Sequence, residues 1–191
     1  MNLGLEGRVC VIAGDTRAIG AATERMLSQE GARVLSAGSQ GADIELDLTA
    51  PDAGERLLQA CPGTPWALVN DLAACPPPKK ITDSAWEQSW ELHVMAPMRL
   101  MRSLALAMAG AGGGRVVNVT SPAAVMEAAE LSLSRVFADG FAARGVLVNA
   151  VTRGAAAEEE VAAAITFLCS ERASNVTGAA WAVDRGERPS G

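Results

Sequence analysis

The amino-acid sequence predicts an α/β fold, a single doubly wound domain over residues 1–191 built on a parallel sheet. Short apolar runs rich in β-branched residues alternate along the chain with Ala-rich segments of helical spacing. The first unit reads as a strand over 9–13, a turn at Gly14, a helix over 19–29 and a strand over 33–36. A helix that connects two strands favours their parallel pairing. A chain of 191 residues is long enough for one core and short for two.

The remaining elements continue this alternation. Further strands are expected over residues 43–46, 67–69, 115–119, 146–151 and 179–183. Helices are expected over residues 51–60, 83–108, 123–143 and 157–169. Pro97 lies inside the long helix 83–108, where it predicts a kink. The run from Pro76 to Lys80 predicts an extended loop.

Composition excludes several classes of function. The formal charge of -6 comes without a basic run, so nucleic-acid binding is not expected. No segment has the pattern of a signal peptide or the length of a membrane span, and a cytoplasmic location is expected. The four cysteines are scattered, which predicts small buried side chains and neither a metal site nor a disulfide framework: Cys10, Cys61, Cys75 and Cys169.

Several segments resemble known motifs, in the same order. They are the glycine loop 13–20, Asp47-Leu48-Thr49, residues 69–73, residues 93–97, the strand 114–121, the strand 144–151 and the ending 159–178. In this order they are similar to the motifs of the short-chain dehydrogenase/reductase family over nearly the whole chain. The resemblance implies a Rossmann-like fold, and in active members an NAD(P) cofactor at the glycine loop.

The resemblance also shows where the chain departs from active members. The family transfers a proton with a Tyr-x-x-x-Lys pair, in which the lysine favours the ionised tyrosine. The aligned positions fall near Ala123 and Glu127, and the sequence contains no tyrosine. His93 occupies the position of the family's assisting asparagine. Ser121 alone matches the active-site set, so we expect no catalytic residue here beyond the vestigial Ser121 and His93.

The glycine loop departs as well. Gly14 and Gly20 are retained, but Ala18 stands at the middle glycine, and Asp15 places a carboxylate where a pyrophosphate would lie. Arg17 matches an arginine common in NADP-using relatives. Beyond the loop, Asp47 and Asn70 are expected to be vestiges of the cofactor site. We therefore expect no cofactor in this chain, with NAD only in an active partner.

Three connections are shorter than the family pattern. After Ser36 there is no room for the helix that normally links those strands, and after Ser121 the chain enters a helix within a few residues. After Val151 it passes almost directly into the last helix, which removes the substrate lid. The resemblance therefore predicts a domain trimmed at its ligand sites.

The parts that are kept are those through which the family assembles. The resemblance implies subunit contacts through helices 83–108 and 123–143 and through the last helix and strand, 157–183. The first hypothesis is therefore a non-catalytic subunit that joins an active short-chain dehydrogenase paralog in a heterotetramer and stabilises it, with a hydroxyacyl-CoA-type substrate for the complex.

Two alternatives stay open. One is a cofactor-independent isomerase, lyase or cyclase that uses His93 with Glu127 or Asp71, and Ser121, in a remodelled cleft. The other is a regulator that binds NAD or a nucleotide. A single histidine on a helix with tryptophans is more often a packed or interface residue than a catalytic one.

Overall fold

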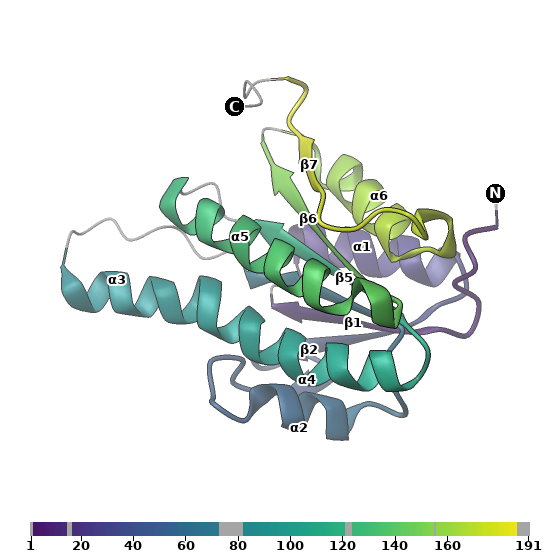
Figure 1. Ribbon diagram of the computed structural model, residues 1–191, viewed down its shortest axis with the longest axis horizontal. Coiled ribbons are helices and arrows are strands. Elements are labelled where there is room, and N and C mark those ends of the chain that lie inside the picture. Colours follow the sequence, from purple (N-terminus) through teal and green to yellow (C-terminus); the bar gives the residue numbers. More distant parts are fainter. Residues whose placement is uncertain (1, 15–16, 73–81, 121–123, 155, 187–191) are drawn as a thin grey trace.

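The computed structural model describes residues 2–14, 17–72, 82–120, 124–154 and 156–186 (Figure 1). Seven parallel strands form one sheet in the order β3-β2-β1-β4-β5-β6-β7. The strands are β1 Val9–Gly14, β2 Arg33–Gly38, β3 Ile44–Glu45, β4 Ala67–Asp71, β5 Gly114–Thr120, β6 Val146–Arg153 and β7 Ala180–Val183. The order reverses between β1 and β4, which is the topological switch point where α/β proteins of this kind place their ligands.

Helices cover both faces of the sheet (Figure 1). They are α1 Ala18–Gln29, α2 Ala53–Ala60, α3 Asp83–Trp90, α4 Ala96–Gly110, α5 Ala124–Phe141 and α6 Glu158–Cys169. Short turns also occur, the π-helical η2 Glu91–Met95 and the 3-10 turns η3 Ala142–Arg144 and η4 Glu171–Ala173. The predicted doubly wound fold is confirmed, and the ends of the elements differ from prediction by at most two residues.

Alternate residues of the strands point to opposite faces of the sheet and pack into two separate hydrophobic cores. Val11 and Val116 point toward α2, α4 and α5 and join one buried cluster. Ile12 and Val117, one residue further along the same strands, join the cluster under α1 and α6. This period of two is why the central strands read as continuous apolar runs, since both of their faces are buried.

The predicted helix 83–108 is one helical run with a π turn in its middle. Pro97 has no N–H to donate to the carbonyl of His93, so regular α-helical bonding fails one turn before it. The chain adapts with η2, in which the Ala96 N–H donates to the carbonyl of Glu91, five residues back. The expected kink therefore takes the form of a π bulge that carries His93.

Two predicted shortenings can be compared with the structure. β2 and β3 are joined by residues 39–43 without a helix. Between β6 and α6 only residues 154–157 intervene, of which 155 lies outside the described residues. The predicted loop 76–80 and Cys75 also lie outside them. Among the helices that are described, none is both long and apolar enough to cross a membrane.

Candidate functional site

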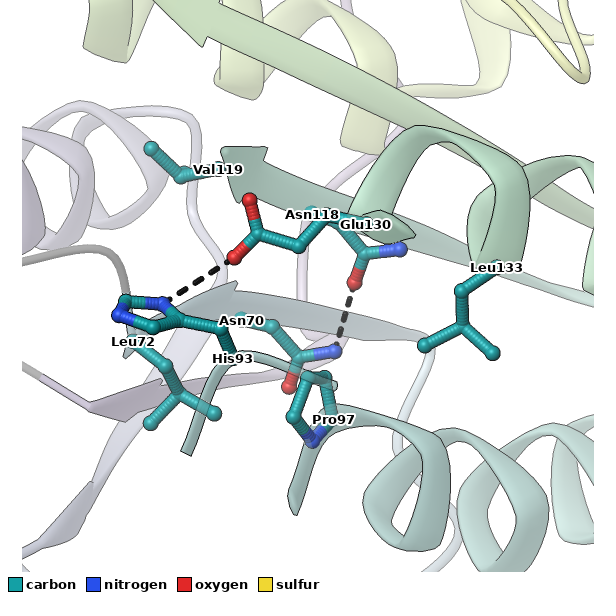
Figure 2. Close-up of a pocket in the computed structure, with 8 residues that line it drawn as sticks. All are labelled: Asn70, Leu72, His93, Pro97, Asn118, Val119, Glu130 and Leu133. Atoms are coloured by element: carbon teal, nitrogen blue, oxygen red, sulfur yellow. Dashed lines mark hydrogen bonds and ion pairs between the residues drawn. The ribbon is translucent and has the colours of Figure 1, made fainter. Parts of the chain in front are cut away.

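Polar side chains gather at the carboxyl ends of β4 and β5, beside the switch point (Figure 2). We name the eight residues that line this small cavity the polar chamber: Asn70, Leu72, His93, Pro97, Asn118, Val119, Glu130 and Leu133. They come from β4, the π turn, α4, β5 and α5. Parallel strands end at one edge of the sheet, and the helices on either side of β5 close over that edge.

His93 and Glu130 face each other inside the chamber (Figure 2). The imidazole Nδ1 lies 3.3 Å from the carboxylate Oε1, and the two side chains are 1% and 7% exposed. The distance is that of an ion pair, but the geometry is not that of a hydrogen bond, and neither imidazole nitrogen has a hydrogen-bond partner among the described residues. The pair links the π turn to α5 and places an acid beside a base away from bulk water.

A chain of hydrogen bonds runs beside this pair. Asn70 Nδ2 donates to Asn118 Oδ1 at 2.7 Å, and Asn118 Nδ2 donates to Ser134 Oγ at 2.8 Å. The Ser134 hydroxyl in turn donates to the backbone carbonyl of Glu130, also at 2.8 Å. Asn70 is therefore not placed to contact a ligand with its amide nitrogen; it joins β4 to β5, and through them to α5.

The space inside the chamber is small. The cavity measures about 10 Å³, which is room for about one water molecule. Buried oxygens without a hydrogen-bond partner among the described residues occur at Asn70 Oδ1 and, at the end of β5, Thr120 Oγ1. In this conformation the chamber can hold and orient a proton or a water molecule, and it has no room for an organic substrate.

The neighbouring half of the same edge is closed by local turns. The backbone N–H and hydroxyl of Ser36 both donate to one carboxylate oxygen of Asp43, at 2.9 and 2.8 Å, and the Asp43 N–H donates back to the Ser36 hydroxyl. We name residues 36–43 the β2 turn. These bonds lower the pKa of Asp43, the backbone bond first. The turn stands where the missing helix would begin.

Asp47 is held in a second local turn. Its Oδ1 accepts from the side-chain hydroxyl of Thr49 at 2.7 Å and from the Thr49 backbone N–H at 3.0 Å. Both bonds lower the pKa of the Asp47 carboxyl, the side-chain bond first. The carboxylate stays exposed, but one of its oxygens is already committed within the chain.

The glycine loop keeps part of its expected geometry. Gly14 has φ +125°, and a Cβ there would lie 2.2 Å from the carbonyl oxygen of Asp71, so only glycine fits. Ala18 begins α1 at φ +44°, in the left-handed region that an L side chain adopts only with strain. Gly20 is buried in the first turn of α1. The expected residues Asp15, Ser121 and Ala123 lie outside the described residues.

Glu130 is the site residue that sequence reasoning missed. The acid–base alternative paired His93 with Glu127 or Asp71, and the structure places Glu130, one turn beyond Glu127 on α5, against the imidazole. Glu127 is half-buried, whereas Glu130 is buried. The available signal was a charged residue three positions from Glu127, on the side of α5 that carries the buried Met126 and Ser134.

Known proteins similar to this chain match it over most of its length. Residues 8–166 match the short chain dehydrogenase family. The oxidoreductase YvaG of Bacillus subtilis is 30% identical over 88% of this chain and 75% of its own length. The cis-4-hydroxycyclohexanecarboxylate dehydrogenase of Sinomonas cyclohexanicum is 29% identical over 94% of this chain and 96% of its own.

Solved structures show the same fold. The L-sorbose reductase of Gluconobacter frateurii, crystallised with NADPH and L-sorbose, superposes with a TM-score of 0.88 over 96% of this chain and 97% of that protein, at 24% identity. At that identity the likeness concerns the fold.

Proposed function

Because the chain belongs to the short chain dehydrogenase family and its sequence contains no tyrosine, we propose that it is a non-catalytic subunit. In this role it assembles with an active NAD-dependent short-chain dehydrogenase paralog and stabilises it. The observation that carries the proposal is the missing tyrosine. The family's proton transfer needs a phenol, and Glu127 at the aligned lysine position would oppose its ionisation.

The residues around the glycine loop do not fit a dinucleotide. The Ala18 methyl group takes the place of a glycine hydrogen where backbone N–H groups must approach a pyrophosphate. In the β2 turn, the Asp43 carboxylate accepts hydrogen bonds from the backbone N–H and the hydroxyl of Ser36. The buried Leu72 occupies space where the family has a small residue beside the adenosine. We propose that NAD is bound by the active partner and not by this chain.

The polar chamber also supports a structural role for this chain and not a catalytic one. Asn70 and Asn118 of its lining bond to each other, and the cavity of about 10 Å³ excludes a substrate. The His93–Glu130 contact joins η2 to α5, and the Asn70–Asn118 bond joins β4 to β5, across the edge where active relatives carry out chemistry. Such cross-links suit a subunit whose role is structural. They keep the fold rigid before binding, so that less conformational entropy is lost when the partner binds.

The experiment that tests the proposal is gentle affinity purification from the native cell followed by native mass spectrometry. We expect a defined complex with a longer, tyrosine-containing short-chain dehydrogenase, in which calorimetric titration with NAD(H) and NADP(H) gives heat for the partner alone. The partner's substrate would then be tested first among hydroxyacyl-CoA thioesters. Recovery of the chain only by itself, or NAD oxidoreduction by the purified chain, would refute the proposal.

The 3.3 Å contact between His93 and Glu130 favours one second candidate, a cofactor-independent acid–base enzyme. A carboxylate beside an imidazole is a common way to prepare a general base. In that case Glu130, and not Glu127, would be the partner of His93. His93→Gln would then abolish an activity while leaving the subunit composition unchanged, whereas a non-catalytic subunit would show no activity to abolish.

A further inference from the structure

A groove opens at the edge of the sheet opposite the polar chamber, where the parallel strands begin. It is lined by residues 7–9 at the start of β1, residues 64–66 before β4 and residues 111–113 before β5, and these three strands are neighbours in the sheet. We name it the amino groove. Its volume is about 410 Å³, within the range of about 300–1,000 Å³ that is usual for sites of small molecules.

The lining of the amino groove combines one cation with apolar walls. Arg8 is its one charged side chain, and no carboxylate belongs to the lining. Val9, Pro65 and Trp66 provide apolar surface, and Thr64 provides an exposed hydroxyl. The remaining lining residues are alanine and glycine, whose small size leaves the groove open. This lining fits a ligand that has one negative charge and a small apolar body.

Arg8 is held in place before any ligand binds. Its Cζ lies 4.0 Å from the centroid of the Trp66 ring, and its Nη2 donates to Glu171 Oε1 at 2.7 Å. The indole is fixed in turn, because its N–H donates to the Cys169 carbonyl at 2.8 Å. The Arg8 side chain is still 42% exposed, and among the described residues its guanidinium bonds to no second acceptor. A stacked guanidinium with N–H groups to spare loses little conformational entropy when it binds an anion.

A second cation lies on the same indole ring. The Arg115 Cζ is 4.7 Å from the Trp66 centroid, the side chain is buried, and its Nε and Nη1 donate to backbone carbonyls. Within the described part of the chain, Glu171 is the one carboxylate that forms an ion pair with Arg8 or Arg115. Two guanidinium groups therefore share one carboxylate beside the groove, and this balance favours the binding of a single negative charge.

Other charged side chains of this edge do not offset that balance. The Glu6 carboxylate packs against the backbone of Gly31, and Arg172 donates to the carbonyl of Asn2. Six charged residues, three acidic and three basic, occupy the adjoining turns and helix ends outside the lining: Glu6, Glu30, Arg33, Asp139, Arg144 and Arg172. The cation in the lining is thus left with Glu171 as its one counter-charge.

We propose that the amino groove binds a small monocarboxylate, with the carboxylate on Arg8 and the apolar body against Trp66 and Pro65. A single carboxylate matches the one uncompensated charge, whereas a doubly charged phosphate would require a second cation in the lining. The site is separate from the polar chamber, because the two lie at opposite edges of the sheet. It goes beyond the proposed function and does not depend on it.

The test follows the indole N–H signals of the ¹⁵N-labelled full chain by NMR, with benzoate as the probe and benzamide as its neutral match. The chain has four tryptophans, and the signal that is missing in Trp66→Phe is that of Trp66. We expect benzoate to shift the Trp66 signal with a dissociation constant on the order of 1 mM and to leave the other three unchanged. Benzamide should bind at least about 10-fold more weakly, because it has no charge to pair with Arg8.

Three variants separate binding from structure. Arg8→Gln should weaken benzoate binding at least about 10-fold, and Arg33→Gln, which changes an exposed arginine on the adjacent strand β2, should stay within about 2-fold of the wild type. Glu171→Gln removes the competing carboxylate and should tighten binding about 3-fold. If the Arg8–Glu171 pair served the fold alone, Glu171→Gln would not tighten binding.

Circular dichroism checks that each variant is folded; if Arg8→Gln is not, Glu171→Gln and the comparison of benzoate with benzamide decide the question. A Trp66 signal that benzoate leaves unchanged, equal binding of benzamide, or unchanged affinity in Arg8→Gln overturns this inference. Each of these outcomes leaves the proposed function standing, because that function is tested by the complex recovered from the native cell.

Discussion

The two halves of the carboxyl edge of the sheet are closed in different ways. On the β1–β2 side, the bonds join residues close in sequence: Ser36 with Asp43, and Asp47 with Thr49. On the β4–β5 side, the polar chamber joins residues far apart in sequence: Asn70 with Asn118, and His93 with Glu130. The carboxylates of the first half, Asp43 and Asp47, are exposed, whereas the side chains of the second half are buried.

This difference predicts how each half responds to change. A local exposed turn contributes little to stability, because water replaces its hydrogen bonds and the unfolded chain partly keeps the turn. A buried polar network depends on all its members, because losing one leaves another unsatisfied in a low dielectric. Substitutions in the polar chamber should therefore be costly and non-additive, and those in the β2 turn should be mild and additive.

The largest effect is expected at the His93–Glu130 pair. Glu130→Leu leaves the imidazole buried beside an apolar side chain and should lower the free energy of unfolding by roughly 3 kcal/mol. Replacing both residues, His93→Leu/Glu130→Leu, should cost clearly less than the sum of the two single changes. Urea denaturation of the four proteins measures this coupling. If the losses of unfolding free energy in the two single variants add up to the loss in the double variant, His93 and Glu130 are not energetically coupled.

The next effect is expected at Asn118, which both accepts and donates in the chamber. Asn118→Leu removes the partner of the Asn70 amide and a donor to Ser134, and should cost roughly 2 kcal/mol of unfolding free energy. Asn175→Ala, at an exposed position, serves as the matched control and should change stability by less than about 0.5 kcal/mol. Equal losses of unfolding free energy in the two variants would show that the polar chamber is no more sensitive to substitution than the exposed surface.

A smaller effect is expected in the β2 turn, and it depends on pH. Asp43→Ala removes the two bonds that the carboxylate accepts from Ser36 and should cost about 1 kcal/mol at pH 7, toward the low end for two bonds because the carboxylate is exposed. Since the fold lowers the pKa of Asp43, the contribution is present above the ordinary carboxyl pKa of about 4 and is lost as pH falls through the folded value.

The measurement is chemical denaturation of wild type and Asp43→Ala at pH 7 and at pH 3. The difference in stability between the two proteins should shrink at the lower pH. Asp52→Ala, an exposed aspartate whose side chain makes no cap bond to α2, is the control and should show no such trend. A difference that grows on acidification would contradict the assigned bonds.

The smallest effect is expected at Ala18, and it is a gain. Ala18→Gly relieves the left-handed backbone at φ +44° but gives the unfolded chain more freedom, so the net stabilisation should be about 0.5 kcal/mol. The same variant tests the cofactor proposal. If the Ala18 methyl group were the one obstacle, Ala18→Gly would restore a thermal shift with NAD(H); we expect none, because the β2 turn and Leu72 remain.

Much of the candidate site could be located from the sequence, but its contacts could not. The strand ends that carry Asn70 and Asn118 follow from apolar runs, and parallel pairing puts them at one edge. That Asn70 bonds to Asn118 is a consequence of register, since the two face each other as partners in β4 and β5. Register depends on packing against the helices and not on either strand alone.

The sequence by itself determined the class of fold, the position of most elements, the absence of tyrosine and the shortened connection after β2. These depend on local periodicity and on residue identity, which need no neighbours in space. Only the tertiary structure decided that His93 meets Glu130 and not Glu127. A π turn shifts the helical phase around His93, and the way α5 packs on the sheet selects which of its carboxylates faces inward.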